Sequence, residues 1–299
     1  MRILITGASG LVGTSLSAHL QKCGHSVVPL ARTAHHDQPW WDIGAGKIDW
    51  GVDPHFDAVI HLAGENIVSG RWNAAKKERI RMSRVSGTTL LAQSLAEKEV
   101  KPGLFICCSA VGFYGDRGDE ELTEQSPPGT GFLPQVCQEW EAACSPAAEA
   151  GIRTVNTRFG MVLSPNGGAL QKMLLPFRLG LGGPAGSGRQ FMSWIDIEDL
   201  CDAMAHIINN TSLHGPVNLV SPHPVRNKEF SQALGKAIHR PAVLPVPALA
   251  LRLLLGEMAD ALLLSSARAV PQKLLDSGFH FAHPHLQESL HLNTRRKGD

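Results

Sequence analysis

Three evenly spaced glycines near the start of the chain have the spacing of a turn that binds phosphate groups. They form a G-x-x-G-x-x-G pattern that follows a short apolar run, residues 3–5, and precedes a helical pattern beginning at Leu11. Glycines let backbone amides approach a diphosphate, and a helix N-terminus offers unpaired N–H donors and a partial positive charge. A glycine turn without a ligand is the alternative. The pattern predicts a dinucleotide-binding turn made by Gly7, Ser9, Gly10, Leu11, Val12 and Gly13.

Arg32 is the residue expected to select between the two nicotinamide dinucleotides. A site selective for NAD places a carboxylate after the second strand, where it bonds the ribose 2′-hydroxyl. This chain has Ala31-Arg32 at that place. A guanidinium can hold a 2′-phosphate through two parallel hydrogen bonds. Arg32 therefore predicts NADP(H) as the cofactor, the alternative being a solvated arginine in a loop.

The elements that must position these residues follow from the alternation of apolar runs with helical patterns. Strands are expected over residues 3–5, 27–30, 57–62, 104–109 and 154–159, and helices over 11–22 and about 73–97. A further helix carries on its apolar face Leu133, Val136, Cys137, Trp140 and Cys144. Strands that alternate with helices indicate a parallel sheet covered on both faces. We predict an α/β fold, a doubly wound and mostly parallel Rossmann sheet with a smaller, mainly helical C-terminal lobe.

Changes in composition along the chain set the expected domain boundaries. Residues 1–163 are predicted to form the Rossmann NADP-binding domain, onto which 191–220 packs back. Residues 164–190 hold two glycine-rich stretches typical of loops near a ligand or a hinge. Together with 221–292 they are assigned to a small substrate or cap lobe. A helix is expected to start within 193–200, and the polar residues 293–299 to form a disordered tail.

Bulk composition argues against several classes of protein. The formal net charge is +1, so no strong field would recruit nucleic acid or an anionic membrane. The N-terminus lacks a signal-peptide pattern, no stretch is apolar enough to span a bilayer, and the six cysteines include no C-x-x-C pair. We therefore expect a soluble, cytoplasmic protein. The leucine-rich stretch 249–264 is expected to pack the small lobe, with a homodimer contact as an alternative.

The fourteen histidines do not predict a metal site. His280, His283 and His285 lie close together, but proline and phenylalanine interrupt the stretch. No cysteine lies nearby, and no pair has the helical i, i+4 spacing of zinc ligands. We therefore expect a small molecule, and not a metal ion, as the partner of the dinucleotide.

Several further segments carry a family resemblance that extends over essentially the whole chain. Besides the glycine turn at 6–13, they are residues 57–66, 71–73, 83–88, 109–115, 140–141, 175–184 and 193–200. With these segments the chain resembles the extended short-chain dehydrogenase/reductase superfamily. It is most similar to the atypical "epimerase family" branch, which is related to nucleoside-diphosphate-sugar epimerases. The resemblance implies a Rossmann domain with a small C-terminal lobe that forms a cleft over the nicotinamide.

The resemblance also assigns cofactor residues outside the glycine turn. It implies that Leu62, Ala63 and Gly64 line the cofactor, as the matching segment does in relatives. Arg84 stands where most extended members place an asparagine, in their N-V-x-G-T segment. A cation at that place would be suited to a cofactor phosphate, or to a carboxylate or phosphate of the substrate.

The substrate residues that the resemblance suggests lie in two segments. Arg189 and Gln190 precede Trp194 where relatives direct an arginine toward a nucleotide-sugar phosphate; a solvated loop is the alternative. Glu65 and Asn66 directly follow the cofactor-lining segment. We expect them to orient the substrate, with capping of the next element as the alternative.

The catalytic positions depart from the family pattern. Extended members use a Tyr-x-x-x-Lys pair, in which the lysine ammonium lowers the tyrosine pKa and binds the nicotinamide ribose. The matching positions here are Leu133 and Cys137, and the usual Ser/Thr position is Ala110. Ser109 and Tyr114, the chain's single tyrosine, are the remaining catalytic candidates. The alternative is that Ser109 bonds the backbone and Tyr114 packs under the loop.

The sequence thus favours an NADP(H)-binding protein of the epimerase family. Its predicted function is that of an oxidoreductase or epimerase-like enzyme acting on a small polar or nucleotide-linked substrate without the usual Tyr-x-x-x-Lys dyad. A catalytically silent NADP(H)-binding sensor or regulatory protein is the alternative.

Overall fold

The computed structural model describes residues 1–34 and 37–294 of the 299-residue chain. Its central strands are β1 (Arg2–Thr6), β2 (Ser26–Leu30), β5 (Ala58–His61), β6 (Leu104–Ala110), β8 (Arg153–Phe159) and β12 (Gly215–Leu219). They form one six-stranded parallel sheet in the order β12-β8-β6-β5-β1-β2.

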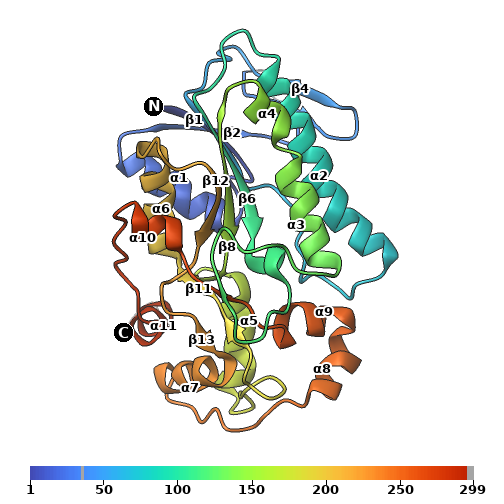
Figure 1. Cartoon of the computed structure of the whole chain (residues 1–299), viewed down its shortest axis with the longest axis vertical. Helices are drawn as coiled ribbons and strands as arrows, with labels where there is room; N and C mark the ends of the chain where they lie inside the picture. The colour runs from blue at the N-terminus through green and yellow to red at the C-terminus, as the bar shows by residue number, and fades with distance from the viewer. Residues whose placement is uncertain (35–36, 295–299) are drawn as a thin grey trace.

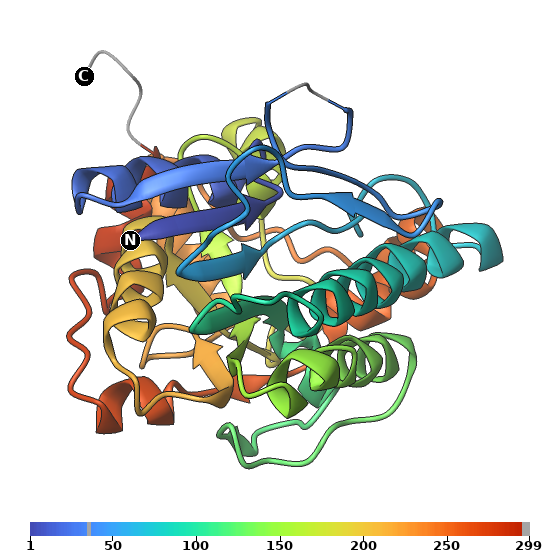
Figure 2. The same ribbon diagram turned by 90° about the horizontal axis from the view of Figure 1, so that it is seen from above.

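Helices cover both faces of this sheet (Figure 1). Helices α1 (Leu11–Lys22) and α6 (Ile197–Asn209) pack on one face, and α2 (Ala74–Ala96), α3 (Phe132–Ala142) and α4 (Ser145–Glu149) on the other. Figure 2 shows α2, in teal, beside α3, in green. The arrangement confirms the prediction of a doubly wound, parallel α/β sheet.

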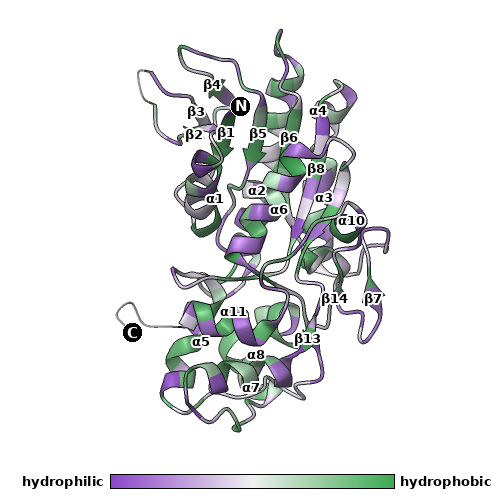
Figure 3. Cartoon of the chain, turned by 90° about the vertical axis from the view of Figure 1, so that its left-hand side faces the viewer, coloured by the Kyte–Doolittle hydropathy of each residue, from purple (hydrophilic) through white to green (hydrophobic). Residues whose placement is uncertain are grey.

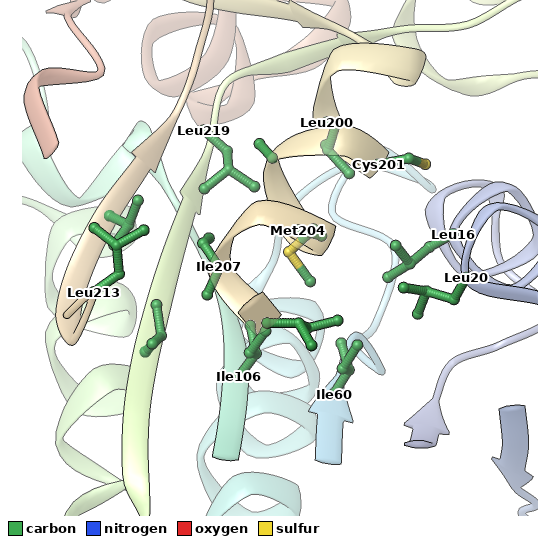
Figure 4. Close-up of a cluster of buried hydrophobic side chains, with 14 of the residues drawn as sticks. Leu16, Leu20, Ile60, Ile106, Leu200, Cys201, Met204, Ile207, Leu213 and Leu219 are labelled. Carbon is green, nitrogen blue, oxygen red and sulfur yellow. The ribbon is translucent and has the colours of Figure 1, made fainter. Parts of the chain in front are cut away.

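The core follows from the alternation of side chains along each strand. Ile3 and Ile5 of β1 pack with α1 and α6, whereas Leu4 between them packs in the cluster that includes α2. Figure 4 shows the first cluster, in which Leu16 and Leu20 of α1 point toward side chains of α6. Because both faces are buried, the strands β1, β5 and β6 are hydrophobic over most of their length (Figure 3).

From the order of the strands, we expect the ligand crevice at the carboxyl ends of β1 and β5. Strand β1 lies between β2 and β5, so the chain reverses direction across the sheet at this point. In open α/β sheets, ligands bind at such a reversal. Between β2 and β5 the chain forms an antiparallel hairpin of β3 (Trp40–Asp42) and β4 (Lys47–Asp49). The sequence analysis missed this hairpin, whose strands have only three residues each.

A smaller, mainly helical group of elements lies below the sheet in Figure 1. Helices α5 (Gly168–Arg178), α7 (Asn227–Ala237) and α11 (Leu286–Thr294) share one apolar cluster. The group also includes α8 (Ala248–Leu255), α9 (Glu257–Ala259) and the π-helix η2 (Asp260–Leu264), whereas α10 (Gln272–Asp276) packs against β12 in the core of the sheet. This group confirms the helical C-terminal part; the domain boundaries themselves remain a prediction.

Short strand pairs and one 3₁₀ turn connect the two groups. Strand β9 (Met161–Leu163) pairs with β11 (Trp194–Asp196), β10 (Phe191–Met192) with β13 (Val225–Arg226), and β7 (Glu121–Leu122) with β14 (Arg268–Ala269). The turn η1 (Val111–Tyr114) follows β6 directly. Within residues 1–34 and 37–294, no helix combines the length and the apolar character that a bilayer crossing requires.

Two segments contain an element that the sequence did not predict. Helix α5 lies between the two glycine-rich stretches of 164–190, and its side chains Leu170, Leu174 and Phe177 are buried. The helix predicted to start within 193–200 is present, but strand β11 occupies residues 194–196 before it. Helix α6 begins only at Ile197, where the Asp196 side chain caps it by accepting the N–H of Glu198 at 2.9 Å.

The expected tail begins later than the sequence indicated. Asn293 and Thr294 belong to helix α11 and are buried. The Asn293 amide donates at 2.7 Å to Asp196 Oδ2, which explains why these polar residues are ordered. The rest of the predicted tail, 295–299, lies outside the described residues.

Candidate functional site

The glycine turn at the carboxyl end of β1 is closed so tightly that side chains are excluded. Gly7 has a φ of +68°, and a Cβ there would lie 2.9 Å from the backbone nitrogen of Ala63. A Cβ at Gly13 would overlap the carbonyl oxygen of Gly7. Gly10 is the N-cap of α1, and within the described part of the chain no side chain caps this end. The first-turn amides of α1 are therefore available to an external anion, and the cradle fits a diphosphate.

A buried pair of polar side chains anchors the segment expected to line the cofactor. The hydroxyl of Thr6, at the end of β1, accepts the N–H groups of Leu62 and Ala63, each at 3.1 Å. It also lies 2.7 Å from Nδ1 of His61, at the end of β5. A hydroxyl has one hydrogen and two acceptor positions, so Thr6 donates to Nδ1 and the proton of neutral His61 resides on Nε2.

The environment of His61 keeps the ring neutral. Burial, together with the charge of the nearby Arg84 guanidinium, lowers the pKa of His61 to about 3. Nε2 is buried without a hydrogen-bond partner among the described residues. The ring stands perpendicular to that of Trp41, with centroids 5.7 Å apart. The sequence analysis missed Thr6 and His61; the signal was a polar residue at the end of each of two adjacent apolar strands.

Arg32 lies on the outer side of the glycine turn. The register of the two strands pairs Thr6 of β1 with Leu30 of β2. Arg32 is therefore two residues beyond the strand that neighbours the turn, and its side chain is exposed. This placement is compatible with a phosphate at the adenosine end of a dinucleotide.

Arg84 lies beside the segment that follows β5. Its Nη1 donates to the carbonyl oxygens of Glu65 and Ile80, both at 3.1 Å. The guanidinium carbon lies 5.0 Å from the centre of the Trp140 ring and 3.5 Å from where a Cβ of Gly64 would be. The structure thus brings Arg84 and Gly64 together at the inner side of the crevice.

Ser109, one of the two catalytic candidates, belongs to a buried polar network. Its hydroxyl donates at 2.7 Å to Oε1 of Glu141. Arg158 binds both oxygens of the same carboxylate, through Nε and Nη2, each at 2.8 Å. The side chains of Arg158 and Glu141 are only 3% and 12% exposed. Because the hydroxyl hydrogen of Ser109 is directed at a carboxylate, Ser109 is oriented by this network.

Tyr114, the other candidate, has no exposed surface. Its hydroxyl lies 2.7 Å from Oδ1 of Asn218 and 3.0 Å from the carbonyl of Thr123, and it accepts a hydrogen bond from Arg158 Nη1 at 3.0 Å. Burial raises the pKa of Tyr114, although Arg158 opposes the rise. This placement favours packing under the loop over the catalytic role that the sequence suggested.

The positions of the missing dyad face the turn after β6. A Cβ on Gly112 would lie 3.6 Å from Cβ of Leu133 and 3.9 Å from Sγ of Cys137. Burial raises the pKa of Cys137 to about 12, with a contribution from Glu141, whereas Arg84 opposes it. The thiol is thus protonated at neutral pH and is a weak acid.

Glu65 and Asn66 lie in a loop held by a lysine that the sequence analysis did not single out. Nζ of Lys76 is buried and bonds Glu65 Oε1 at 2.6 Å, Asn66 O at 2.7 Å and Ser69 Oγ at 2.7 Å. The hydrogen bond from Lys76 lowers the pKa of the Glu65 carboxyl. The Asn66 side chain accepts the N–H of Val68 at 3.0 Å. These bonds hold the loop itself; the cap of the next helix, α2, is Asn73 and neither Glu65 nor Asn66.

The second group of expected substrate residues is divided between interior and surface. Gln190 is buried and donates to the carbonyls of Ala185 at 3.0 Å and Leu263 at 2.8 Å. Trp194 is fully buried, and its indole N–H bonds the carbonyl of His223 at 3.1 Å. Only Arg189 is exposed. Across residues 1–34 and 37–294, no three His, Cys, Asp or Glu side chains are grouped as metal ligands.

Two family models match the chain. The model of the NAD dependent epimerase/dehydratase family matches residues 3–219. A domain of unknown function matches residues 246–291, which include helices α8 to α10.

Similar proteins extend over the whole chain. An epimerase family protein of Mycobacterium bovis is 42% identical over 298 residues, which cover 99% of this chain and 98% of that protein. The crystal structure of the human epimerase family protein SDR39U1 with NADPH superposes with a TM-score of 0.90, at 34% identity and 98% coverage of each chain. A nucleoside-diphosphate sugar epimerase from Corynebacterium glutamicum has a TM-score of 0.77 at 35% identity, covering 100% of this chain and 59% of its own.

These matches confirm the resemblance drawn from the motifs. The glycine turn, the strand order and the segment after β5 all fall within the matched residues 3–219. The chain belongs to the NAD dependent epimerase/dehydratase family.

Proposed function

We propose that this chain binds NADP(H) at the glycine turn and acts as an oxidoreductase on a small polar or nucleotide-linked substrate. The observation that carries the proposal is the cradle at Gly7 and Gly13, where backbone atoms fill the space of a side chain and the first turn of α1 is uncapped. The crystal structure of the human relative with NADPH supports the choice of ligand.

The residues of the crevice have distinct tasks in this proposal. A bound nicotinamide cofactor supplies hydride transfer. The amides of α1 bind the diphosphate, and Arg32 binds the 2′-phosphate. Thr6 holds the amides of Leu62 and Ala63, so that the segment after β5 presents a fixed wall.

The missing dyad affects both reactions of the proposed class. Reduction of a carbonyl and epimerisation through a keto intermediate each require a group that exchanges a hydroxyl proton, and in this chain water or a group of the substrate would exchange it. Leu133 and Cys137 replace the pair that does this in extended members, and Cys137 has a pKa raised to about 12. We propose a structural role for Tyr114 and a positioning role for Ser109, whose hydroxyl is held by Glu141.

A silent NADP(H) sensor is the second candidate function. The observation that favours it is the network of Ser109, Glu141 and Arg158, because the hydroxyl of Ser109 is already engaged by the Glu141 carboxylate. A sensor binds the cofactor with the same residues but transfers no hydride.

Two measurements on the purified protein test the proposal. Fluorescence titration should give tighter binding of NADPH than of NADH, and Arg32→Ala should weaken NADPH by about 10-fold or more while changing NADH little. Transfer of deuterium from 4-deuterated NADPH to carbonyl compounds and nucleotide sugars is then followed by mass spectrometry. Transfer to any of them supports the oxidoreductase; binding without transfer supports the sensor. An equal loss of affinity for NADPH and for NADH in Arg32→Ala would show that Arg32 does not bind the 2′-phosphate.

We further propose a cytoplasmic location and a small-molecule partner. A net charge of +1 provides no field for nucleic acid or an anionic membrane. A homodimer is the alternative to a monomer, supported by Leu249, Leu253 and Leu254 of α8, which are 68%, 70% and 73% exposed.

A further inference from the structure

Arg84 places a positive charge beside Gly64, in the segment that follows β5, without a carboxylate bonded to it. Its hydrogen bonds to described residues are those from Nη1 to two backbone carbonyls, Glu65 O and Ile80 O. The Glu65 carboxylate, which raises the pKa of Arg84, is itself bonded to Lys76. Burial lowers the pKa of Arg84, yet a guanidinium remains charged in proteins. A half-buried cation without an anion is costly, so this arrangement favours a polar or anionic ligand.

The side chain is fixed in one orientation. Nη1 bonds carbonyls from the loop after β5 and from α2, and the guanidinium lies over the Trp140 ring with a separation of 5.0 Å. A Cβ on Gly64 would be 3.5 Å from Cζ and 3.6 Å from Nη2. Because residue 64 is glycine, a ligand can approach the guanidinium. Nε and Nη2 remain as donors for it.

The position of the missing dyad lysine lies on helix α3. Cys137 of α3 occupies that position in the family pattern. The positive charge of Arg84 opposes the rise in pKa that burial causes at Cys137 and at Cys108 of β6, so the guanidinium is near both thiols. Helix α3 therefore lacks the family lysine, and Arg84 of α2 supplies a positive charge in the same region.

The sheet order indicates which half of a dinucleotide Arg84 would meet. The glycine turn follows β1, Gly64 follows β5, and Cys108 belongs to β6, which are consecutive strands in the sheet. Neighbouring strands are about 4.8 Å apart. Arg84 is therefore displaced by one to two strand spacings from the diphosphate cradle, on the side away from Arg32.

We propose that Arg84 takes over the binding task of the dyad lysine, with Nε and Nη2 bonding the nicotinamide-ribose half of NADP(H). The inference rests on the proposed function, because it requires the dinucleotide to lie across the glycine turn. It assigns to Arg84 a binding role and no proton transfer. Arg84 therefore fixes the nicotinamide end, while Arg32 fixes the adenosine end.

The test compares a whole cofactor with its adenosine half. NADPH and adenosine 2′,5′-bisphosphate are titrated by calorimetry into wild type, Arg84→Gln and the matched control Arg79→Gln, which removes an exposed charge from the same helix. We expect Arg84→Gln to weaken NADPH by about 10- to 100-fold, the loss of one or two charge-assisted hydrogen bonds, and to leave the bisphosphate unchanged. Arg79→Gln should change neither. Equal weakening of both ligands, or of neither, overturns the inference.

Moving the positive charge from α2 to α3 by mutation gives an independent test. Cys137→Lys restores the family lysine, so it should recover most of the NADPH affinity in the Arg84→Gln background and lower it in the wild type, where two cations would repel. Thermal unfolding shows which variants fold. If the double variant does not fold, Arg84→Lys is measured in its place. Arg84→Lys should bind NADPH more tightly than Arg84→Gln, and equal affinity of the two variants contradicts the inference. A wild type that binds neither NADPH nor the bisphosphate contradicts the proposed function instead.

Discussion

Replacing Thr6 with valine removes the hydroxyl that links β1 to β5 while nearly preserving the shape of the side chain. Three hydrogen bonds end at this oxygen: those from the amides of Leu62 and Ala63, and the one to His61 Nδ1. The Leu62 amide keeps its bond to the Thr6 carbonyl at 3.3 Å. The variant therefore leaves two groups without their partner: the half-buried amide of Ala63 and Nδ1 of the fully buried His61.

The magnitude follows from these two groups. A buried polar group that loses its partner costs about 1–3 kcal/mol, so we expect Thr6→Val to lower the free energy of unfolding by about 2–6 kcal/mol. Thr6→Ser is the matched control, because it keeps the hydroxyl and loses one methyl group, for about 1 kcal/mol. The segment 62–64 should also lose its fixed position, and NADPH binding should weaken in the valine variant.

Urea unfolding followed by circular dichroism measures the first effect, and fluorescence titration with NADPH the second. Both the free energy of unfolding and the NADPH affinity should decrease in the order wild type, Thr6→Ser, Thr6→Val. Equal urea midpoints for Thr6→Ser and Thr6→Val would refute the argument that the hydroxyl anchors the segment after β5.

Two further expectations concern buried titratable groups. Tyr114→Phe should lower the free energy of unfolding by about 1–3 kcal/mol, because Asn218 and Arg158 lose a partner, with little change in NADPH affinity; lost hydride transfer at unchanged stability would instead indicate a catalytic tyrosine. For His61, the pKa falls from 6.5 to about 3 on folding, so its contribution is intact above pH 6.5 and is lost as the pH falls toward 3. At pH 5.5 the loss should be about 1.4 kcal/mol, measured as a difference in the pH dependence of urea unfolding between wild type and His61→Gln, and parallel pH profiles would contradict it.

The strands and helices of the sheet could be predicted because their patterns are local. Helix α1 was expected at its observed bounds, since the glycines before Leu11 and the glycine after Cys23 mark both ends. Strand β11 was not recognised because a tryptophan, an isoleucine and an aspartate give no alternation when all three are buried. The burial of Asn293 depends on Asp196, a contact between residues far apart in the sequence.

The site was predictable at the glycine turn and much less so at its inner end. The positions of Gly7 and Gly13 follow from chain geometry, which a motif encodes directly. The role of Lys76 depends on how the loop 65–69 folds around its ammonium group, and the link between Thr6 and His61 depends on strand pairing. For Tyr114, the residue type suggested catalysis. Its buried position, where the hydroxyl bonds Arg158 and Asn218, depends on contacts between distant parts of the chain that the sequence does not show.

Isothermal titration of NADPH and NADH into the folded wild-type chain tests the central claim most directly. The account expects one dinucleotide bound per chain, with NADPH clearly tighter than NADH. The absence of binding heat for both nucleotides, confirmed by unchanged thermal unfolding in their presence, would contradict it.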